Sequence, residues 1–237
     1  TTEIYTLSLH DALPIYVNPQ ALAGAIGTGT HGTGAELGSL STAARGFRLM
    51  MPDGSIVSCT ESERPELFQA ARLSLGLVGV ATEIEIDVLP AYHLEERVES
   101  HRFEEIEARW DELAASNRHV EFFVFPYGDY VVLKTLNPVP GEGPLKRMND
   151  MDDRAFRMVC DVCALAPWLT RHLQPRIVGP GVRTRRVGPA YQIFPSDRTV
   201  RFEEMEYELP RANGWAALKE VIRSEEHTSE LQSPCNL

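Results

Sequence analysis

The stretch Gly27–Gly34, GTGTHGTG, is the feature that most constrains how this chain folds. It lies within residues 24–42, a segment made mostly of Gly, Ala, Ser and Thr. Such a segment has poor helix propensity and few side chains to place in a core, so its contribution must come from its backbone. Successive N–H groups of a glycine-rich loop can surround an anion, and threonine hydroxyls add further donors.

The same run also satisfies the pattern G-x-G-x-x-G at Gly27, Gly29 and Gly32, which in a Rossmann unit binds a dinucleotide pyrophosphate. That use requires a buried strand before the run and a helix that starts at its second or third glycine. Residues 33–38, TGAELG, are a poor helix start, and Asp53 belongs to a Pro-Asp-Gly turn. We therefore favour an anion-binding loop over a Rossmann fingerprint, with a flexible linker as the remaining alternative.

The two ends of the chain differ in character from the rest. Residues 1–15 and 223–237 resemble the translation of short-read sequencing adapters, so we expect the natural segment to be residues 16–222. Ends of that origin were never selected for burial. We expect them to pack poorly against the rest of the chain.

Net charge narrows the classes of partner. The chain carries a net charge of −11, and without the two ends it carries about −7. An acidic surface argues against nucleic acid as a partner. No apolar run reaches the ~18 residues of a membrane span, so the sequence does not indicate membrane association.

Three cysteines lie within the natural segment: Cys59, Cys160 and Cys163. The last two have C-x-x-C spacing, but they fall with Leu165 on one face of a helical pattern, which favours buried core cysteines over a zinc site. A zinc site would need two more ligands at comparable spacing, and none is present, so we predict no metal. Reduced cysteines fit a cytoplasmic protein.

Apolar periodicity predicts two parts divided near Pro90 to His93. The first part contains a hairpin around Pro52-Asp53-Gly54, a short helix entered through Pro65, and an alternating strand over 81–90 with Ile84, Ile86 and Val88 on one face.

The second part is expected to open with a strand near 92–100 and an amphipathic helix over 103–117, with Phe103, Ile106, Trp110 and Leu113 on one face. The remaining expected elements are two strands within 119–137, a helical and Pro-rich segment over 152–189, a strand over 198–210 and a helix from 216.

Residues 22–94, with GTHGTG, LFQAAR and GVATE, resemble the second half of the FAD-binding domain of flavin-dependent sugar-1,4-lactone oxidases in the vanillyl-alcohol-oxidase superfamily. Residues 91–222, notably HVEFFVFPY and VRFEEMEYELPR, resemble their substrate domain. The resemblance implies an α+β chain: part of a PCMH-type FAD-binding domain over 16–90, then a truncated α+β substrate domain with an antiparallel sheet over 91–222.

The resemblance implies that the glycine-rich loop lies along FAD and contacts it mostly through its backbone. For His31 two roles stay open: a contact with the flavin, or only a local hydrogen bond within the loop. Gly79 and Val80 are implied near the adenine end. The implied loop residues are Gly24, Ala25, Gly27, Thr28, Gly29, Thr30, His31, Gly32, Thr33, Gly34 and Ala35, with Thr30, Thr33 and Gly34 the foremost candidates.

The resemblance also implies an activity for the parent protein: oxidation of a secondary alcohol of a sugar lactone or polyol, with dioxygen or another compound as the final electron acceptor. A lactone dehydrogenase, an alditol oxidase or a non-catalytic binding module are the alternatives. The family's first FAD subdomain and its catalytic Glu/Arg pair are expected outside residues 16–222, so this fragment should be inactive. Glu206 is a candidate for a carboxylate facing the flavin, and an exposed acidic strand face shared with Glu204 and Glu208 is its alternative.

Overall fold

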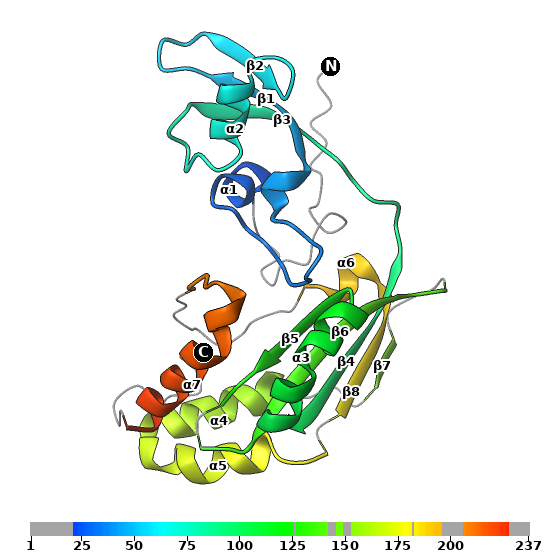
Figure 1. Ribbon diagram of the computed structural model, residues 1–237, viewed down its shortest axis with the longest axis vertical. Helices are drawn as coiled ribbons and strands as arrows, with labels where there is room; N and C mark the ends of the chain where they lie inside the picture. The colour runs from blue at the N-terminus through cyan, green and yellow to red at the C-terminus, as the bar shows by residue number, and fades with distance from the viewer. Residues whose placement is uncertain are drawn as a thin grey trace. The chain divides into compact units, whose positions relative to one another are not determined.

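A computed structural model describes residues 21–125, 127–141, 146–148, 153–181, 183–195 and 206–227 (Figure 1). The chain is α+β and divides into two compact units. Among the described residues, the first unit consists of 21–94, 138–141 and 188–195, and the second of 95–125, 127–137, 146–148, 153–181, 183–187 and 206–227.

The first unit is built on a three-stranded antiparallel sheet in the order β2-β1-β3. β1 (Ala44–Met50) and β2 (Ile56–Thr60) form the predicted hairpin, and β3 (Val80–Ile86) pairs with the other edge of β1. In the hairpin turn the Asp53 carboxylate accepts hydrogen bonds from the Ser55 hydroxyl at 2.7 Å and from the Ser55 N–H at 2.9 Å. These bonds stabilise the ionised form and lower the pKa of Asp53.

The predicted helix α2 (Pro65–Ala71) covers one face of this sheet. It begins with a proline, which the first turn of a helix tolerates because its N–H would have no partner there. Phe68 packs against Phe47 with ring centroids 5.9 Å apart. Cys59 is completely buried beside them, and burial raises the pKa of its thiol.

Two short elements before the sheet were not predicted: α1 (Leu22–Gly27) and the 3-10 helix η2 (Leu40–Ala43). Ala25 and Ile26 are buried in the core of the unit. Their burial outweighs the poor helix propensity of the neighbouring glycines. The prediction for Val88 was also wrong, because β3 ends at Ile86 and Val88 is exposed.

The second sheet has five strands in the order β5-β6-β4-β8-β7. β4 (His93–Arg102), β5 (His119–Phe123) and β6 (Tyr130–Val139) were predicted from the sequence. β8 (Arg183–Pro189), which pairs antiparallel with β7 (Lys146–Met148), was not. It falls in a segment expected to be helical and Pro-rich, and its arginines find carboxylate partners on β4 that no local pattern shows.

α3 (Phe103–Ser116) lies along the sheet in Figure 1, and its predicted apolar face is confirmed. Ile106 and Leu113 are buried against β5 and β6. Trp110 meets Phe122 edge to face at a centroid distance of 5.0 Å. From α7 (Arg211–His227), Trp215 stacks on Phe122 at 5.7 Å and so joins the second helix to the same cluster.

The opposite face of the sheet carries a ladder of alternating charges across four neighbouring strands, made by Glu121, Lys134, Glu96 and Arg186. The Lys134 ammonium lies 3.1 Å from Glu121 and 3.7 Å from Glu96. Arg186 donates two hydrogen bonds to Glu96, at 2.7 and 2.6 Å. The Glu96 side chain is only 5% exposed, so its charge depends on these partners rather than on water.

Because neighbouring residues of a strand face opposite ways, Glu95 points to the other side of the sheet from Glu96. There it accepts hydrogen bonds from Arg97, at 2.7 Å, and from Arg185. Burial alone would raise the pKa of Glu95, but the two arginines outweigh burial and hold the pKa below its usual range.

The segment after β7 forms α4 (Asp153–Leu165), the 3-10 helix η3 (Pro167–Leu169) and α5 (Thr170–Ile177). Cys160 and Cys163 are buried and form no disulfide, which confirms the prediction of core cysteines. Leu165 was expected on the same face but is 89% exposed. The short helix α6 (Ala190–Ile193) follows β8.

Some expectations fall outside the described residues, namely those for residues 1–15 and for 198–205, including Glu204. Residues 206–210 form no strand, although one was expected over 198–210. Residues 223–227 continue α7, which begins at Arg211 rather than at 216. In the part of the chain that the structure describes, no helix is long and apolar enough to cross a membrane.

The buried ladder predicts a large loss of stability when its central carboxylate is neutralised. We expect Glu96→Gln to lower the free energy of unfolding by about 3–5 kcal/mol, because the buried Arg186 and Lys134 both lose the carboxylate that they share. Urea unfolding of the variant and the wild type measures this difference. Glu112→Gln, which removes an exposed pair with Arg109 on α3, is the control and should change little. Equal effects of the two substitutions would contradict the ladder's role.

Glu95 predicts a pH dependence of stability. Since its folded-state pKa lies below the ordinary 4.5, its contribution is fully present above that value and is lost as the pH falls through the lowered pKa. The difference in unfolding free energy between wild type and Glu95→Gln should therefore be constant near neutrality and shrink below about pH 4.5. Urea unfolding at a series of pH values tests this, and a difference that instead shrinks as the pH rises toward neutral would show the sign to be wrong.

Candidate functional site

The glycine-rich run follows α1 as a loop without regular secondary structure that ends at η2. Two of its glycines have positive φ, Gly29 at 72° and Gly34 at 127°. L-amino acids with a side chain rarely adopt such angles. Glycine is therefore required at these two positions by the path of the backbone.

The first half of the loop folds back onto α1. The N–H groups of Thr28, Gly29 and Thr30 donate to the carbonyls of Gly24, Ile26 and Ala25, at 3.0, 3.1 and 2.9 Å. These three donors already serve the loop itself, so an anion bound here would have to use other groups of the segment. The hydroxyls of Thr28 and Thr30 lie 3.4 Å apart, and that of Thr28 donates to the Gly24 carbonyl.

The loop is fixed at both ends to the first unit. Leu40 donates its N–H to the Thr30 carbonyl at 2.8 Å, and Leu75 donates to the Gly27 carbonyl at 3.0 Å. A Cβ atom at Gly29 would lie 2.7 Å from the side chain of Leu73. The segment is thus an anchored loop, and a flexible linker is the wrong description of it.

This arrangement also decides against a Rossmann fingerprint, as predicted. The helix α1 comes before the run instead of starting within it, and the next element, η2, begins at Leu40. No helix N-terminus among residues 28–39 faces the glycines, so the phosphate-binding geometry of a Rossmann turn is not formed there.

For His31 the structure shows a local contact. Its Nδ1 atom lies 3.0 Å from the carbonyl oxygen of Gly32, and the side chain is exposed. The remaining predicted loop residues, Gly32, Thr33, Gly34 and Ala35, follow it in the irregular part of the loop. Their assignment to a cofactor stays a prediction.

Gly79 and Val80 lie at the start of β3. Gly79 has φ 132°, and a Cβ atom there would lie 2.9 Å from the carbonyl oxygen of Met50 on β1. Val80 pairs with Met50 and is 59% exposed. The close approach of two strands therefore accounts for the glycine, whatever the role of this corner in binding.

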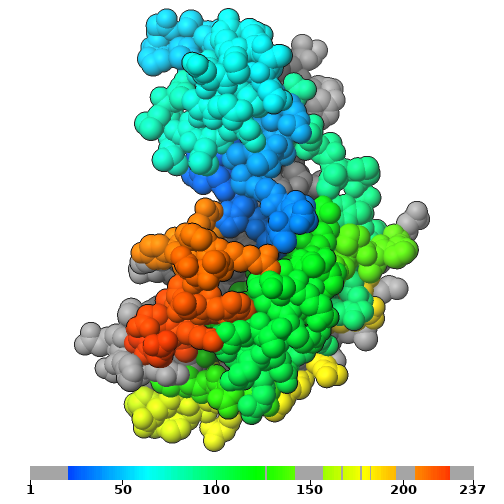
Figure 2. Space-filling view, in the orientation of Figure 1, coloured from blue at the N-terminus to red at the C-terminus, as the bar shows by residue number. Residues whose placement is uncertain are grey.

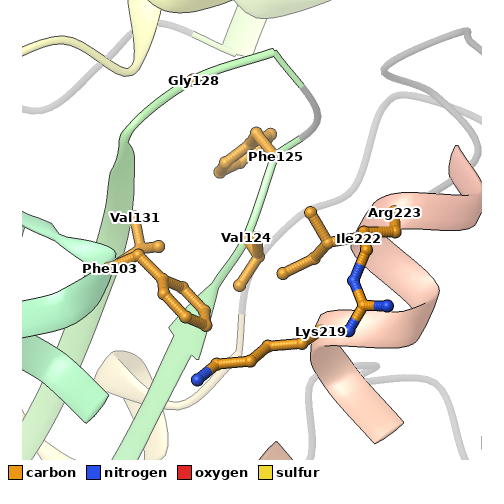
Figure 3. Close-up of a pocket in the computed structure, with 8 residues that line it drawn as sticks. All are labelled: Phe103, Val124, Phe125, Gly128, Val131, Lys219, Ile222 and Arg223. Carbon is orange, nitrogen blue, oxygen red and sulfur yellow. The ribbon is translucent and has the colours of Figure 1, made fainter. Parts of the chain in front are cut away.

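The second unit contains a cavity of about 250 Å³ between the β5–β6 loop, β6, α3 and α7, shown in Figure 3. Lys219 and Arg223 supply its cationic groups, and they form ion pairs with Glu107 and Glu220. The lining residues are Phe103, Val124, Phe125, Gly128, Val131, Lys219, Ile222 and Arg223. None is a carboxylate or a histidine, and the one lysine is ion-paired with Glu107, so the cavity is a poor match for a general base acting on a polyhydroxylated substrate.

Glu206, the predicted carboxylate, is exposed in the irregular stretch before α7, and its orientation toward a substrate stays a prediction. No group of three or more potential metal ligands occurs among the described residues. The signal that sequence reasoning missed is the pairing of Leu73 and Leu75 with the glycine loop, which joins residues some 45 positions apart.

The fold is similar to that of a cholesterol oxidase from Brevibacterium sterolicum, with a TM-score of 0.51 over 69% of this chain and 36% of the oxidase chain, at 14% sequence identity. Identity at this level shows a shared fold only. It places the chain in the α+β architecture that the sequence indicates.

A family model named D-arabinono-1,4-lactone oxidase matches residues 84–234. This chain belongs to that family. The matched span includes residues 223–234, which were expected to be foreign to the natural protein.

Curated relatives have related names. L-gulono-1,4-lactone dehydrogenase of Mycobacterium tuberculosis H37Rv is 33% identical over 217 residues, or 87% of this chain and 49% of the relative. D-arabinono-1,4-lactone oxidase of Candida albicans is 31% identical over 165 residues, or 68% of this chain and 28% of the relative. L-galactono-1,4-lactone dehydrogenase of Arabidopsis thaliana is 32% identical over 123 residues. This chain spans about half the length of the mycobacterial relative and less of the others.

The contact at Gly79 generates a test that needs no ligand. We expect Gly79→Ala to destabilise the first unit by on the order of 1–3 kcal/mol, since the new Cβ meets the Met50 carbonyl and φ is unfavourable. Gly76→Ala is the matched control, because Gly76 also has positive φ but has open space around its Cβ position. The melting temperatures of both variants separate the effect of backbone strain from that of the steric contact. Equal decreases in melting temperature would contradict a contribution from the contact with Met50.

Proposed function

We propose that the parent protein of this chain is an FAD-dependent oxidoreductase that oxidises a secondary alcohol of a sugar-1,4-lactone. The observation that carries the proposal is the family match over residues 84–234, supported by relatives whose names specify three different 1,4-lactones. A flavin is the natural cofactor for such a reaction, because it accepts a hydride equivalent from an alcohol carbon.

The glycine-rich loop supports a binding role in two ways. Gly29 and Gly34 allow the backbone to take a path closed to other residues, and the small side chains let a ligand approach the main chain closely. Exposed hydroxyls such as Thr28 lie along the same loop. In this proposal the chain's task is to hold and orient the cofactor, while the alcohol proton is removed by a base elsewhere in the parent protein.

The final electron acceptor is the open part of the proposal. Relatives carry both the name oxidase and the name dehydrogenase, so dioxygen and another acceptor both have support. One alternative is an alditol oxidase, which would act on a polyol instead of a lactone. The other is a binding module without catalytic activity. We also propose a reducing, cytoplasmic location, which suits Cys59, Cys160 and Cys163, because these three described cysteines form no disulfide.

The first test is enzymatic. The full-length parent, purified with its flavin, should oxidise L-gulono-, L-galactono- or D-arabinono-1,4-lactone, followed by flavin bleaching without oxygen and by peroxide formation with it. The 237-residue chain by itself should do neither, because it spans only about half of a relative's length. Turnover by this chain alone would contradict the second expectation, and a full-length protein that fails to bleach with any lactone would contradict the first.

The second test concerns the loop. In the full-length parent we expect Gly34→Val to reduce the flavin absorbance per protein ~5- to 100-fold, because backbone strain of roughly 1–3 kcal/mol appears in cofactor binding. Gly54→Val is the matched control: Gly54 also has positive φ, at 81°, but lies in the hairpin turn with open space around it. Unchanged flavin content in Gly34→Val, or an equal loss in Gly54→Val, would remove the loop from the cofactor site.

A further inference from the structure

α4 is apolar on two opposite faces. Cys160 and Cys163 lie on the buried face, each 1% exposed. On the other face Met158, Val162 and Leu165 recur at i, i+4 and i+7 and are 67%, 40% and 89% exposed. This spacing forms a continuous stripe along a helix.

Trp168 of η3, three residues after Leu165, is also 65% exposed. Single exposed apolar residues are common on soluble proteins, but four within the eleven residues 158–168 are not. We call Met158, Val162, Leu165 and Trp168 the α4 stripe.

The charge of the same region is opposite to that of the chain. Residues 154–186 contain seven arginines and one acidic residue, Asp161, whereas the whole chain has a net charge of −11. Arg185 and Arg186 are used by Glu95 and Glu96. The four other arginines with described side chains, Arg157, Arg171, Arg176 and Arg183, are exposed and form no ion pair with a described residue.

α4, η3 and α5 follow one another directly and pack together, as Figures 1 and 2 show in yellow-green. The segment therefore brings an exposed apolar stripe and unneutralised arginines into one small part of the second unit. Arg157 adjoins Met158 on α4, and Arg171 lies three residues after Trp168.

We propose that the α4 stripe and its arginines dock the protein onto the surface of an anionic lipid bilayer. A helix with leucine, methionine and tryptophan on one face inserts shallowly at the boundary of headgroups and acyl chains. Arginines beside it contact lipid phosphates while their aliphatic stems stay near the apolar layer. Docking of this kind needs no membrane span, and no described helix is long and apolar enough to form one.

Charge complementarity selects this occupant. The chain outside residues 154–186 has a net negative charge, which anionic lipid repels, so residues 154–186 are the part through which such a contact is favourable. The same net charge opposes association of a second copy through other surfaces. An acidic protein partner and a second copy are therefore outcomes that the experiment must be able to reveal.

The experiment is co-sedimentation of the 237-residue chain with vesicles of phosphatidylcholine alone or mixed with phosphatidylglycerol. We expect binding to the anionic vesicles that weakens with added salt, and little binding to phosphatidylcholine alone. Leu165→Glu should reduce the bound fraction at least about fivefold. The double variant Arg157→Gln and Arg171→Gln should reduce it about tenfold or more.

Matched controls separate the stripe from general exposure. Leu77→Glu changes a leucine that is 87% exposed in the first unit, and Arg109→Gln removes an exposed arginine from α3; neither should change vesicle binding. A second readout is the tryptophan fluorescence: a blue shift on anionic vesicles should disappear in Trp168→Phe, since Trp110 and Trp215 lie in the aromatic cluster. Circular dichroism spectra identical to wild type show that each variant is folded.

Four results would overturn the proposal. Equal binding to both vesicle types would show that anionic lipid is not recognised. Equal losses of vesicle binding in Leu165→Glu and Leu77→Glu would show that the α4 stripe is not the docking surface. Absence of vesicle binding together with a dimer in light scattering that Leu165→Glu dissociates would make the stripe an interface between copies. Absence of vesicle binding by a monomer would assign the stripe to contacts with another protein. These results leave the lactone chemistry of the parent untouched, so the two proposals fail independently.

Discussion

The buried ladder of Glu121, Lys134, Glu96 and Arg186 is the constraint on which the second unit depends. Charges this well shielded from water are tolerated only when each has its partner at short range, so the four strands that carry them must keep one order and one register. A slip of a strand by one residue would move its charged residue to the apolar face beneath α3. The ladder therefore fixes where β8 enters the sheet, and through β8 the position of the segment that leads into it.

The other face of the sheet carries Glu95 with its two arginines and, beside them, the apolar cluster. There Trp110, Phe122 and Trp215 hold α3 and α7 on the sheet through edge-to-face and stacked contacts. The cavity beside them is lined mostly by apolar residues, and its two cationic side chains are already ion-paired. The family match covers this part of the chain, but the chemistry of the lining does not support the cavity as the substrate site.

The glycine-rich loop shows how an unusual sequence can serve a fold and a ligand at once. Its first half is held by hydrogen bonds to α1, η2 and the backbone of Leu75, and its positive φ angles are part of that folded path. These contacts make the loop an ordered surface before anything binds. A preformed loop loses less conformational entropy on binding than a linker would, which is the physical basis for giving it a cofactor role in the proposed function.

The sequence by itself determined the local elements and the nature of the glycine segment. The hairpin, α2, α3 and the buried face of α4 follow from periodicity and turn chemistry, which act over a few residues. Tertiary structure alone decided that Arg183–Pro189 forms a strand, that α1 forms despite its glycines, and that Leu165 faces solvent. Such outcomes depend on residues far away in the sequence: Arg186 of the strand, for example, pairs with Glu96, 90 residues before it. A local sequence pattern carries no information about a partner at that distance.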